Sequence, residues 1–230
     1  MIAALLLAVA PATVTEAERA FAADAKAIGQ WAAYRKWAAP DATMFVPEPV
    51  KAQNWLKDRA DPAAAIEWWP TAAWVSCDGT VAVDTGGWKR QDGGVGYFTT
   101  VWRREPDGRW RWIVSHGDHA AAPRPRPASP PIRRAMCGAR LDQQIEHLPP
   151  GLPVPLEHAG KGALGVSDDG SLAWYWGAGW KGGRWVQVTL TAPLDFRHPP
   201  DSSTGSVHFW AEGYKAWPLC VIDDHVDAPQ

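Results

Sequence analysis

Three polar side chains have a type and spacing that suit proton exchange inside an apolar surrounding. Asp24 lies between Phe21 and Ile28 on the predicted apolar face of a helix, whereas Asp84 and His116 lie in predicted strands. A carboxylate removed from water acquires a raised pKa, and a histidine titrates near neutral pH. These three residues are therefore our candidate catalytic acids and bases for moving a carbon-bound proton.

Each candidate also has a structural explanation. Helix drift would leave Asp24 at a solvated rim, and Asp84 could hydrogen bond across the strands to Thr99 or Thr100. His116 could simply end a strand with backbone contacts. The sequence leaves both explanations open for all three residues.

A histidine-rich stretch follows the last predicted strand. His116, Asp118 and His119 form His-x-Asp-His, but this spacing is not an established metal signature. We therefore expect neither a metal site nor a cofactor.

Aromatic residues are unusually frequent, with 16 tryptophans among 230 residues. Most should pack in cores or on pocket walls, because an indole combines a large apolar area with one N–H group. Tyr34 and Tyr97 could also donate a hydrogen bond to an oxyanion. Trp174 and Trp176 face one side of a later strand, where they could stack on a ring ligand or seal two sheets together. The expected ligand-pocket residues are Phe21, Trp31, Tyr34, Phe45, Trp88, Tyr97 and Trp112.

The elements that position these side chains begin with helices. Thr15 to Glu18 fits a capping box, and helical spacing continues until Pro40. Residues 44–46 suggest an extended segment and residues 50–58 a second helix. Asp61-Pro62 predicts a third helical turn.

Four short strands should follow as an antiparallel meander, because Asp-Gly and Gly-Gly sequences supply the positive φ that tight hairpins need. Strand alternation places Asp84 with Ala82, Gly86 and Trp88 on one face. It also places His116 with Trp110, Trp112 and Val114. The predicted strands are Trp74–Cys77, Val81–Trp88, Gly96–Arg104 and Trp110–Ser115.

Composition and the N-terminal sequence indicate which binding partners and which cellular compartment to expect. The net charge of -2 argues against non-specific nucleic-acid binding, and no segment predicts a membrane span. Residues 1–14 contain an apolar run with the small residues Ala8 and Ala10, which predicts a signal segment and a periplasmic or secreted protein, although no Lys or Arg precedes the run.

The second half differs from the first. Residues 120–134 form a proline-rich linker, expected to be a solvated spacer in extended conformation. Residues 135–230 are β-rich, and we detect no internal repeat. Among the cysteines, Cys137 and Cys220 are the expected disulfide, with Cys77 as a buried thiol. The strands expected in this half are 163–167, 172–176, 185–191 and 207–212.

The first half resembles the nuclear transport factor 2-like superfamily. Phe21-Ala-Ala-Asp through Phe45-Val-Pro47 is similar to its opening helix and strand. Residues 85–114, which include Gly96-Tyr97-Phe98-Thr99-Thr100-Val101-Trp102-Arg103, are similar to its last three strands. The closest group is bacterial, of unassigned function, beside SnoaL-like polyketide cyclases and ketosteroid isomerases. The resemblance covers about residues 15–119.

This resemblance implies an α+β fold: a cone-shaped, curved antiparallel sheet around a long N-terminal helix, often dimeric through the sheet. We expect that cone domain over residues 15–119, followed by the linker and a smaller β-rich domain over 135–230. No reaction is implied, because the superfamily includes isomerases, cyclases, dehydratases and proteins that only bind. The expected function is binding of a small apolar or aromatic molecule by an exported protein. The alternative is a cofactor-free isomerase or cyclase that acts by acid–base proton transfer.

Overall fold

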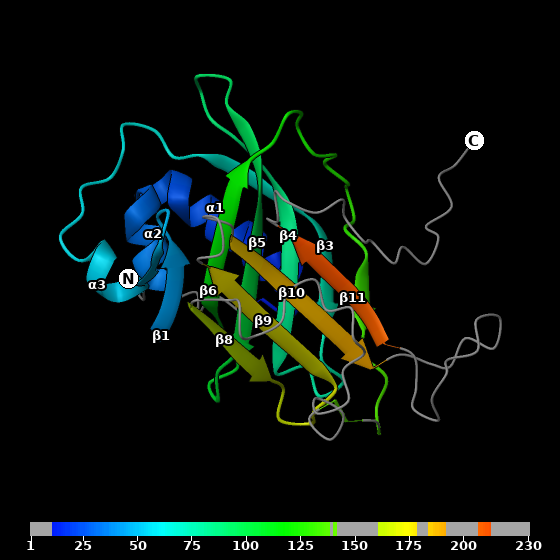
Figure 1. Ribbon diagram of the computed structural model, residues 1–230. Helices are drawn as coiled ribbons and strands as arrows, with labels where there is room; N and C mark the ends of the chain where they lie inside the picture. Colours follow the sequence, from blue (N-terminus) through cyan, green and yellow to red (C-terminus); the bar gives the residue numbers. More distant parts are fainter. Residues whose placement is uncertain (1–10, 139, 142–160, 179–183, 192–206, 213–230) are drawn as a thin grey trace, which may run out of the picture.

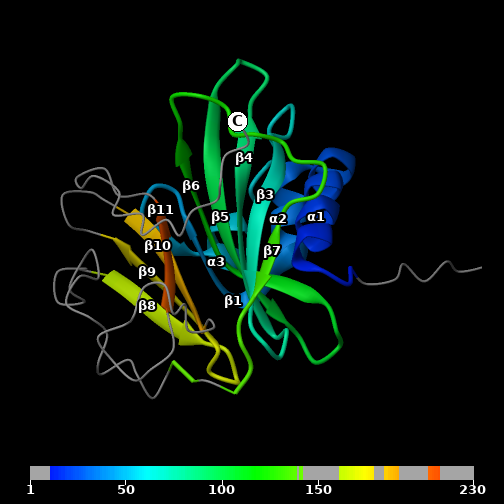
Figure 2. The ribbon, with the colours of Figure 1, turned by 90° about the vertical axis from the view of Figure 1, so that its right-hand side faces the viewer.

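The chain is arranged in three layers, with helices on one face of a seven-stranded sheet and a four-stranded sheet on its other face (Figures 1 and 2). This computed structural model describes residues 11–138, 140–141, 161–178, 184–191 and 207–212. The chain is α+β, as expected. A cone that closes around the first helix stays a prediction.

The first helix, α1 (Val14–Ile28), begins two residues earlier than the sequence pattern indicated. Thr13 is the N-cap and forms the capping box with Glu16, so the predicted Thr15–Glu18 box is wrong. Glu18 points instead into the core, where it is 1% exposed.

The predicted single helix is two helices. Gly29 has a φ of 101°, which breaks the helix before α2 (Gln30–Trp37). The backbone N–H groups of Trp31 and Ala32 donate to the Asp61 carboxylate, which therefore caps α2. This capping role replaces the helical turn predicted at Asp61-Pro62. The second predicted helix is the short α3 (Ala52–Leu56).

The first sheet contains the predicted meander within a larger, mixed arrangement. Its strand order is β2-β1-β6-β5-β4-β3-β7. The β1–β6 and β3–β7 pairs are parallel, so the expectation of an antiparallel sheet holds only for the other pairs. The bounds are β1 (Ala38–Phe45), β2 (Pro49–Lys51), β3 (Glu67–Val75), β4 (Val81–Lys89), β5 (Val95–Arg104), β6 (Trp110–His119) and β7 (Ile132–Arg134).

A β-bulge in β6 changes which face its side chains occupy. The register shifts where Val101 pairs with Val114 and Trp102 with Trp112, which leaves Ile113 as the extra residue. Trp112 consequently packs in the core beneath the helices, and Val114 packs in the core between the sheets. The predicted common face of residues 110, 112, 114 and 116 is therefore wrong.

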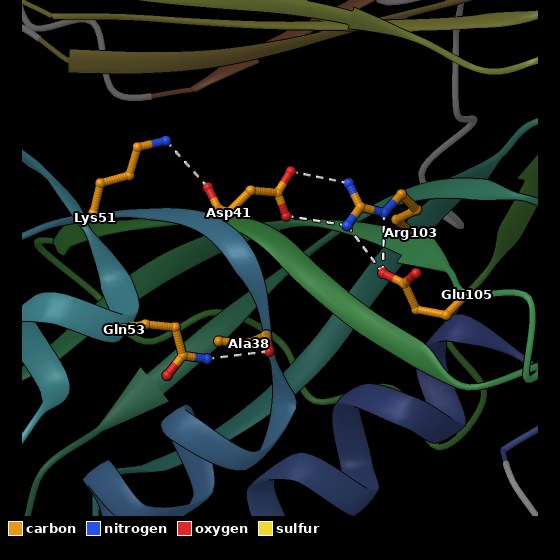
Figure 3. Close-up of polar contacts among 6 residues, drawn as sticks. All are labelled: Ala38, Asp41, Lys51, Gln53, Arg103 and Glu105. Atoms are coloured by element: carbon orange, nitrogen blue, oxygen red, sulfur yellow. Dashed lines mark hydrogen bonds and ion pairs between the residues drawn. The ribbon is translucent and has the colours of Figure 1, made fainter.

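An exposed ion pair joins the irregular strand β1 to β5, across the intervening strand β6. The Arg103 guanidinium donates to both carboxylate oxygens of Asp41, at 3.1 and 3.0 Å (Figure 3). Arg103 also pairs with Glu105, and the Lys51 ammonium donates to the Asp41 carbonyl. These contacts lie at the register shift of β1 between Ala38 and Thr43.

The second sheet has the order β11-β10-β9-β8 and confirms the strands expected in the second half. Its bounds are β8 (Lys161–Val166), β9 (Leu172–Ala178), β10 (Arg184–Thr191) and β11 (Val207–Glu212). Phe45 and Val83 of the first sheet share a core with Trp176 and Val188 of the second. Trp174 packs beside this core, so this pair of tryptophans seals the sheets together.

The two sheets contain the same turn. Ser76 Oγ donates to Asp78 Oδ1 at 2.5 Å, and Ser167 Oγ donates to Asp169 Oδ1 at 2.6 Å. The backbone N–H groups of the residues that start β4 and β9 donate to these serine hydroxyls. Each aspartate also accepts a bond from the other's backbone, at 2.8 and 3.3 Å. The two hairpins therefore share one local turn motif.

The proline-rich segment lies against the first sheet and is not a solvated spacer along its length. The Trp69 indole donates to the Pro125 carbonyl at 2.8 Å, and Arg124 donates to the Thr85 hydroxyl at 2.8 Å. Arg126 pairs with Glu67 at 2.7 Å. The segment then continues into β7 at the edge of the sheet.

The disulfide joins Cys77 to Cys137, with their Cα atoms 5.2 Å apart. The predicted Cys137–Cys220 pair and the predicted free thiol at Cys77 are therefore wrong. Cys77 lies in the first of the two matching turns, directly beside the segment that leads from β7, so the two halves meet there. Cys220 lies outside the described residues.

Candidate functional site

A cavity of about 500 Å³ opens between α2, the ends of β1 and β6, and the strands β4 and β5. This volume lies within the range of small-molecule sites. Most of its wall is apolar, from Phe21, Trp31, Met44, Phe45, Val46, Pro47, Ile66, Trp68, Trp88 and Phe98. Its polar side chains are Glu18, Gln30, Tyr34, Arg90, Thr100, Ser115, His116, Asp118 and His119.

Glu18 is the buried acid of this cavity. It comes from α1, one helical turn before Phe21, and lines the cavity while it is 1% exposed. The Trp68 indole N–H donates to Glu18 Oε1 at 2.5 Å. Burial raises the pKa of Glu18 to about 7, although donation from the Trp68 indole opposes this rise.

Asp84 is the second acid and lies behind Glu18 in β4. It is fully buried, and the Trp102 indole N–H donates to Asp84 Oδ1 at 3.0 Å. Burial raises the pKa of Asp84 well above its usual range, and the negative charge of Glu18 raises it further. Because both carboxyls resist ionisation, the pair retains at least one proton at neutral pH.

Tyr34 is a neutral hydrogen-bonding group on the same wall. Burial raises the pKa of its phenol, and the charge of Glu18 adds to this effect. Its hydroxyl interacts with the side chain of Ser115, which also lines the cavity. Tyr34 therefore remains protonated at all physiological pH values, as a hydrogen-bond donor requires.

His116 also reaches the cavity, from the end of β6 beyond the bulge. It is 2% exposed and meets the Phe45 ring edge-on, with the ring centres 5.3 Å apart. Asp118 and His119 line the same end of the cavity. Within the described ranges, no three His, Cys, Asp or Glu side chains are grouped to hold a metal ion.

The structure does not bring Asp24 to the cavity. Its carboxylate pairs with the Lys36 ammonium at 2.7 Å and accepts a bond from the Trp37 indole at 2.6 Å. The pattern that placed Asp24 on an apolar face treated α1 and α2 as one straight helix. The break at Gly29 instead folds α2 back, so that Lys36 meets Asp24.

Five of the seven expected wall residues line the cavity, namely Phe21, Trp31, Tyr34, Phe45 and Trp88. Trp112 lies beneath the wall, wholly buried, with its ring 5.8 Å from that of Tyr34. Tyr97 lies on the opposite face of the first sheet from Phe98, where the guanidinium of Arg124 covers its ring at 5.1 Å.

Glu18 was missed from sequence because it completed a plausible capping box. A signal for it existed, since Glu18 shares helical spacing with Val14, Phe21 and Ala25, all buried. A charged residue in the middle of an apolar stripe indicates a buried, functional or paired group.

Comparison with known proteins gives structural matches alone. No protein-family model and no curated protein matches the sequence. A ketosteroid isomerase, provisionally assigned, from Parabacteroides distasonis ATCC 8503 matches 48% of this chain and 90% of its own, with 19% identity and a TM-score of 0.40.

Two further matches carry other names. The S. rosetta CaMKII hub covers 48% of this chain and 99% of its own, with 22% identity and a TM-score of 0.35. A nuclear transport factor 2-like superfamily protein from Salmonella enterica covers 47% of this chain and 89% of its own, with 15% identity and a TM-score of 0.35. The matched part of the chain is thus similar to nuclear transport factor 2-like and ketosteroid isomerase-like proteins.

Proposed function

We propose that the protein binds a small molecule with an apolar or aromatic body in the cavity between α2 and the first sheet. The observation that carries this proposal is the cavity of about 500 Å³, with an aromatic wall and the buried carboxyl of Glu18. Small-molecule sites combine such walls with a few polar groups that fix orientation.

Binding can be tested by titration of steroid-like and phenolic compounds with tryptophan fluorescence as the signal. Trp31, Trp68 and Trp88 line the cavity, so a bound ring should change their emission. Trp31→Phe should weaken the signal and Trp88→Leu should weaken binding. Saturable binding that is equal in wild type and Trp88→Leu would place the ligand elsewhere.

Cofactor-free proton transfer, as in an isomerase or cyclase, is the second candidate function. The pKa of Glu18, about 7, favours it because a general acid or base is most effective near its operating pH. Asp84 and His116 remain candidates beside Glu18, and Asp24 serves as a control because it lies outside the cavity wall. Turnover of a bound ketone that is lost in Glu18→Gln and retained in Asp24→Asn would support catalysis.

Export is also part of the proposal. The Cys77–Cys137 disulfide supports it, because such bonds persist mainly in oxidising compartments. Among the described residues, no helix is long and apolar enough to cross a membrane. N-terminal sequencing of the native protein tests export, since an intact Met1 would contradict cleavage of the apolar segment.

A further inference from the structure

No cation among the described residues balances the two buried carboxyls. Their hydrogen-bond donors are the indoles of Trp68 and Trp102, which are neutral. Within the described part of the chain, no Lys, Arg or His forms an ion pair with Glu18 or Asp84. A buried carboxylate normally needs such a partner, because transfer of an isolated charge from water is costly.

The remaining oxygens of the pair are also unsatisfied by ordinary donors. Glu18 Oε2 and Asp84 Oδ2 are buried, and neither completes a hydrogen bond of normal geometry among the described residues. The Thr100 hydroxyl and the Trp102 indole still interact with the Glu18 carboxyl and lower its pKa. The two carboxyls interact with each other while Asp84 is protonated. A proton thus takes the place that a counter-ion would otherwise occupy.

Aromatic rings surround the cavity in front of Glu18. The Phe21 ring lies 4.8 Å from that of Tyr34 and 5.0 Å from that of Trp68, edge to face in both pairs. Trp31 packs edge to face on Tyr34 at 5.4 Å. Rings of this kind attract a cation over their faces, an effect that strengthens when water is excluded.

We propose that the cavity binds a protonated amine carried on an apolar body, with Glu18 as its counter-ion and the surrounding rings as its cage. This inference rests on the proposed function and names its ligand class. A neutral ligand can donate a hydrogen bond to a carboxyl oxygen but supplies no charge to balance Glu18, and an anion would add a second negative charge. An ammonium group supplies both the missing charge and the missing N–H donors.

The proton balance follows from this arrangement. The ligand enters as an ammonium ion and keeps its own protons, one of which it donates to the Glu18 carboxylate. The proton held by Glu18 leaves to solvent, and Asp84 keeps the proton it holds. The pair changes from neutral to a single negative charge, which the ligand balances.

Other titratable groups around the cavity do not cancel this effect. Arg90 lines it, but Arg90 pairs with Asp92 and its side chain is 42% exposed, so its charge is screened. Tyr34 stays neutral, and Asp118 would favour a cation. His116 and His119 also line the cavity, so the experiment needs a variant that isolates Glu18.

The test uses three probes with one ring system and three charges: naphthylmethylamine, naphthylmethanol and naphthoate. Isothermal titration calorimetry of the full chain should show that the amine binds at least about tenfold more tightly than the alcohol at pH 8. In buffers of different ionisation enthalpy, amine binding should release about one proton at pH 6 and almost none at pH 8, where Glu18 is already ionised and the amine is still protonated.

The variants separate a binding role from a structural one. Glu18→Gln keeps an acceptor for the Trp68 indole but carries no charge, so it should lose the preference for the amine and the proton release. Asp24→Asn, a matched change on the same helix outside the cavity, should keep both. Because proton release is measured on wild-type protein, the test does not depend on folding of the variant.

The outcomes are distinct. Preference for the amine with proton release confirms the inference. Equal or tighter binding of the alcohol overturns it and leaves the proposed function intact. Absence of binding by all three probes, and by the steroid-like and phenolic compounds, overturns the proposed function and the inference together.

Discussion

The hairpins β3–β4 and β8–β9 have turns of the same kind, but their strands have different roles. The turns match atom for atom in their serine and aspartate bonds, and Asp78 and Asp169 lie 91 positions apart. The strand pairing next to the two turns also matches, since Val75 pairs with Ala82 and Val166 with Ala173.

The strands after these turns differ in their side chains at two consecutive positions. At the position that corresponds to Asp84 in the first hairpin, the second has Tyr175, opposite Leu164. The position of Thr85 corresponds to Trp176, which packs in the core between the sheets. The turn thus determines the register of each hairpin, while the residue a few positions later determines whether the strand presents a buried polar group or a packing side chain.

Removal of the disulfide should destabilise the protein more than any other change, because it deletes the covalent link at the first turn. Cys77 lies in the first turn, and Asp168 occupies the matching position in the second. Replacement of both Cys77 and Cys137 by Ala should lower the free energy of unfolding by about 4 kcal/mol, from the chain entropy of a loop of 60 residues. Urea unfolding measures this change. An equal loss in Cys220→Ala would contradict the disulfide assignment.

The second prediction contrasts Asp84 and Glu18 with the matching Tyr175. Between about pH 4.5 and 7 the folded protein keeps a proton on Glu18 that the unfolded chain releases, because burial raises the pKa of Glu18 to about 7. The free energy of unfolding should therefore fall as pH rises through this window, by on the order of 2–3 kcal/mol.

Chemical denaturation at a series of pH values measures this slope. Glu18→Gln should reduce it, because Gln binds no proton in either state, and the slope that remains is that of Asp84, whose pKa is also raised by burial. Tyr175→Phe should leave it unchanged, since the phenol of Tyr175 has a raised pKa and stays protonated throughout the window. A wild-type slope of the opposite sign would show that the carboxyl pair is ionised in the folded protein.

The third prediction is that the serine hydroxyls of the two turns stabilise the fold equally. Ser76→Ala and Ser167→Ala each remove one hydroxyl that donates to an aspartate and accepts a backbone N–H. Both serines are buried, so each change should cost about 1–2 kcal/mol. Thermal unfolding of both variants should give losses within about 0.5 kcal/mol of each other. A loss confined to one variant would mean that only that turn supports the fold.

The smallest effect is expected at β1, which has no counterpart in the second sheet. Arg103 and Asp41 form an exposed pair, with 36% and 60% of their side chains accessible. Arg103→Ala should lower the free energy of unfolding by less than about 1 kcal/mol, and added salt should reduce the difference further. Asp41→Asn serves as the matched change. A loss of several kcal/mol would show that the pair determines the register of β1.

Local patterns predicted much of the fold. Asp-Gly turns placed the meander, and alternation placed Asp84 on the face of Ala82 and Trp88, where the structure has it. The strands of the second half were found in the same way. These features depend on neighbours in sequence, so a sequence displays them directly.

The remaining features depend on contacts between distant residues. The bulge at Ile113 reversed the face of the later part of β6, and no residue type marks it. The pairing of Cys77 with Cys137 follows from where β7 lies, which the sequence does not display. Glu18 lies in the site and accepts a hydrogen bond from the indole of Trp68, 50 residues away. Asp24 lies outside it, where the helix break at Gly29 brings α2 alongside α1.

The second sheet covers the face of the first sheet that lies away from the helices (Figure 2). On this face Trp176 and Val188 of the second sheet pack against Phe45 and Val83 of the first. The Cys77–Cys137 disulfide links the two halves beside this core, which keeps the two apolar surfaces at a high local concentration. A shortened product that stops after Arg134 would bare Phe45, Val83 and Val101 to water, and we expect such fragments to self-associate more strongly than the intact protein does.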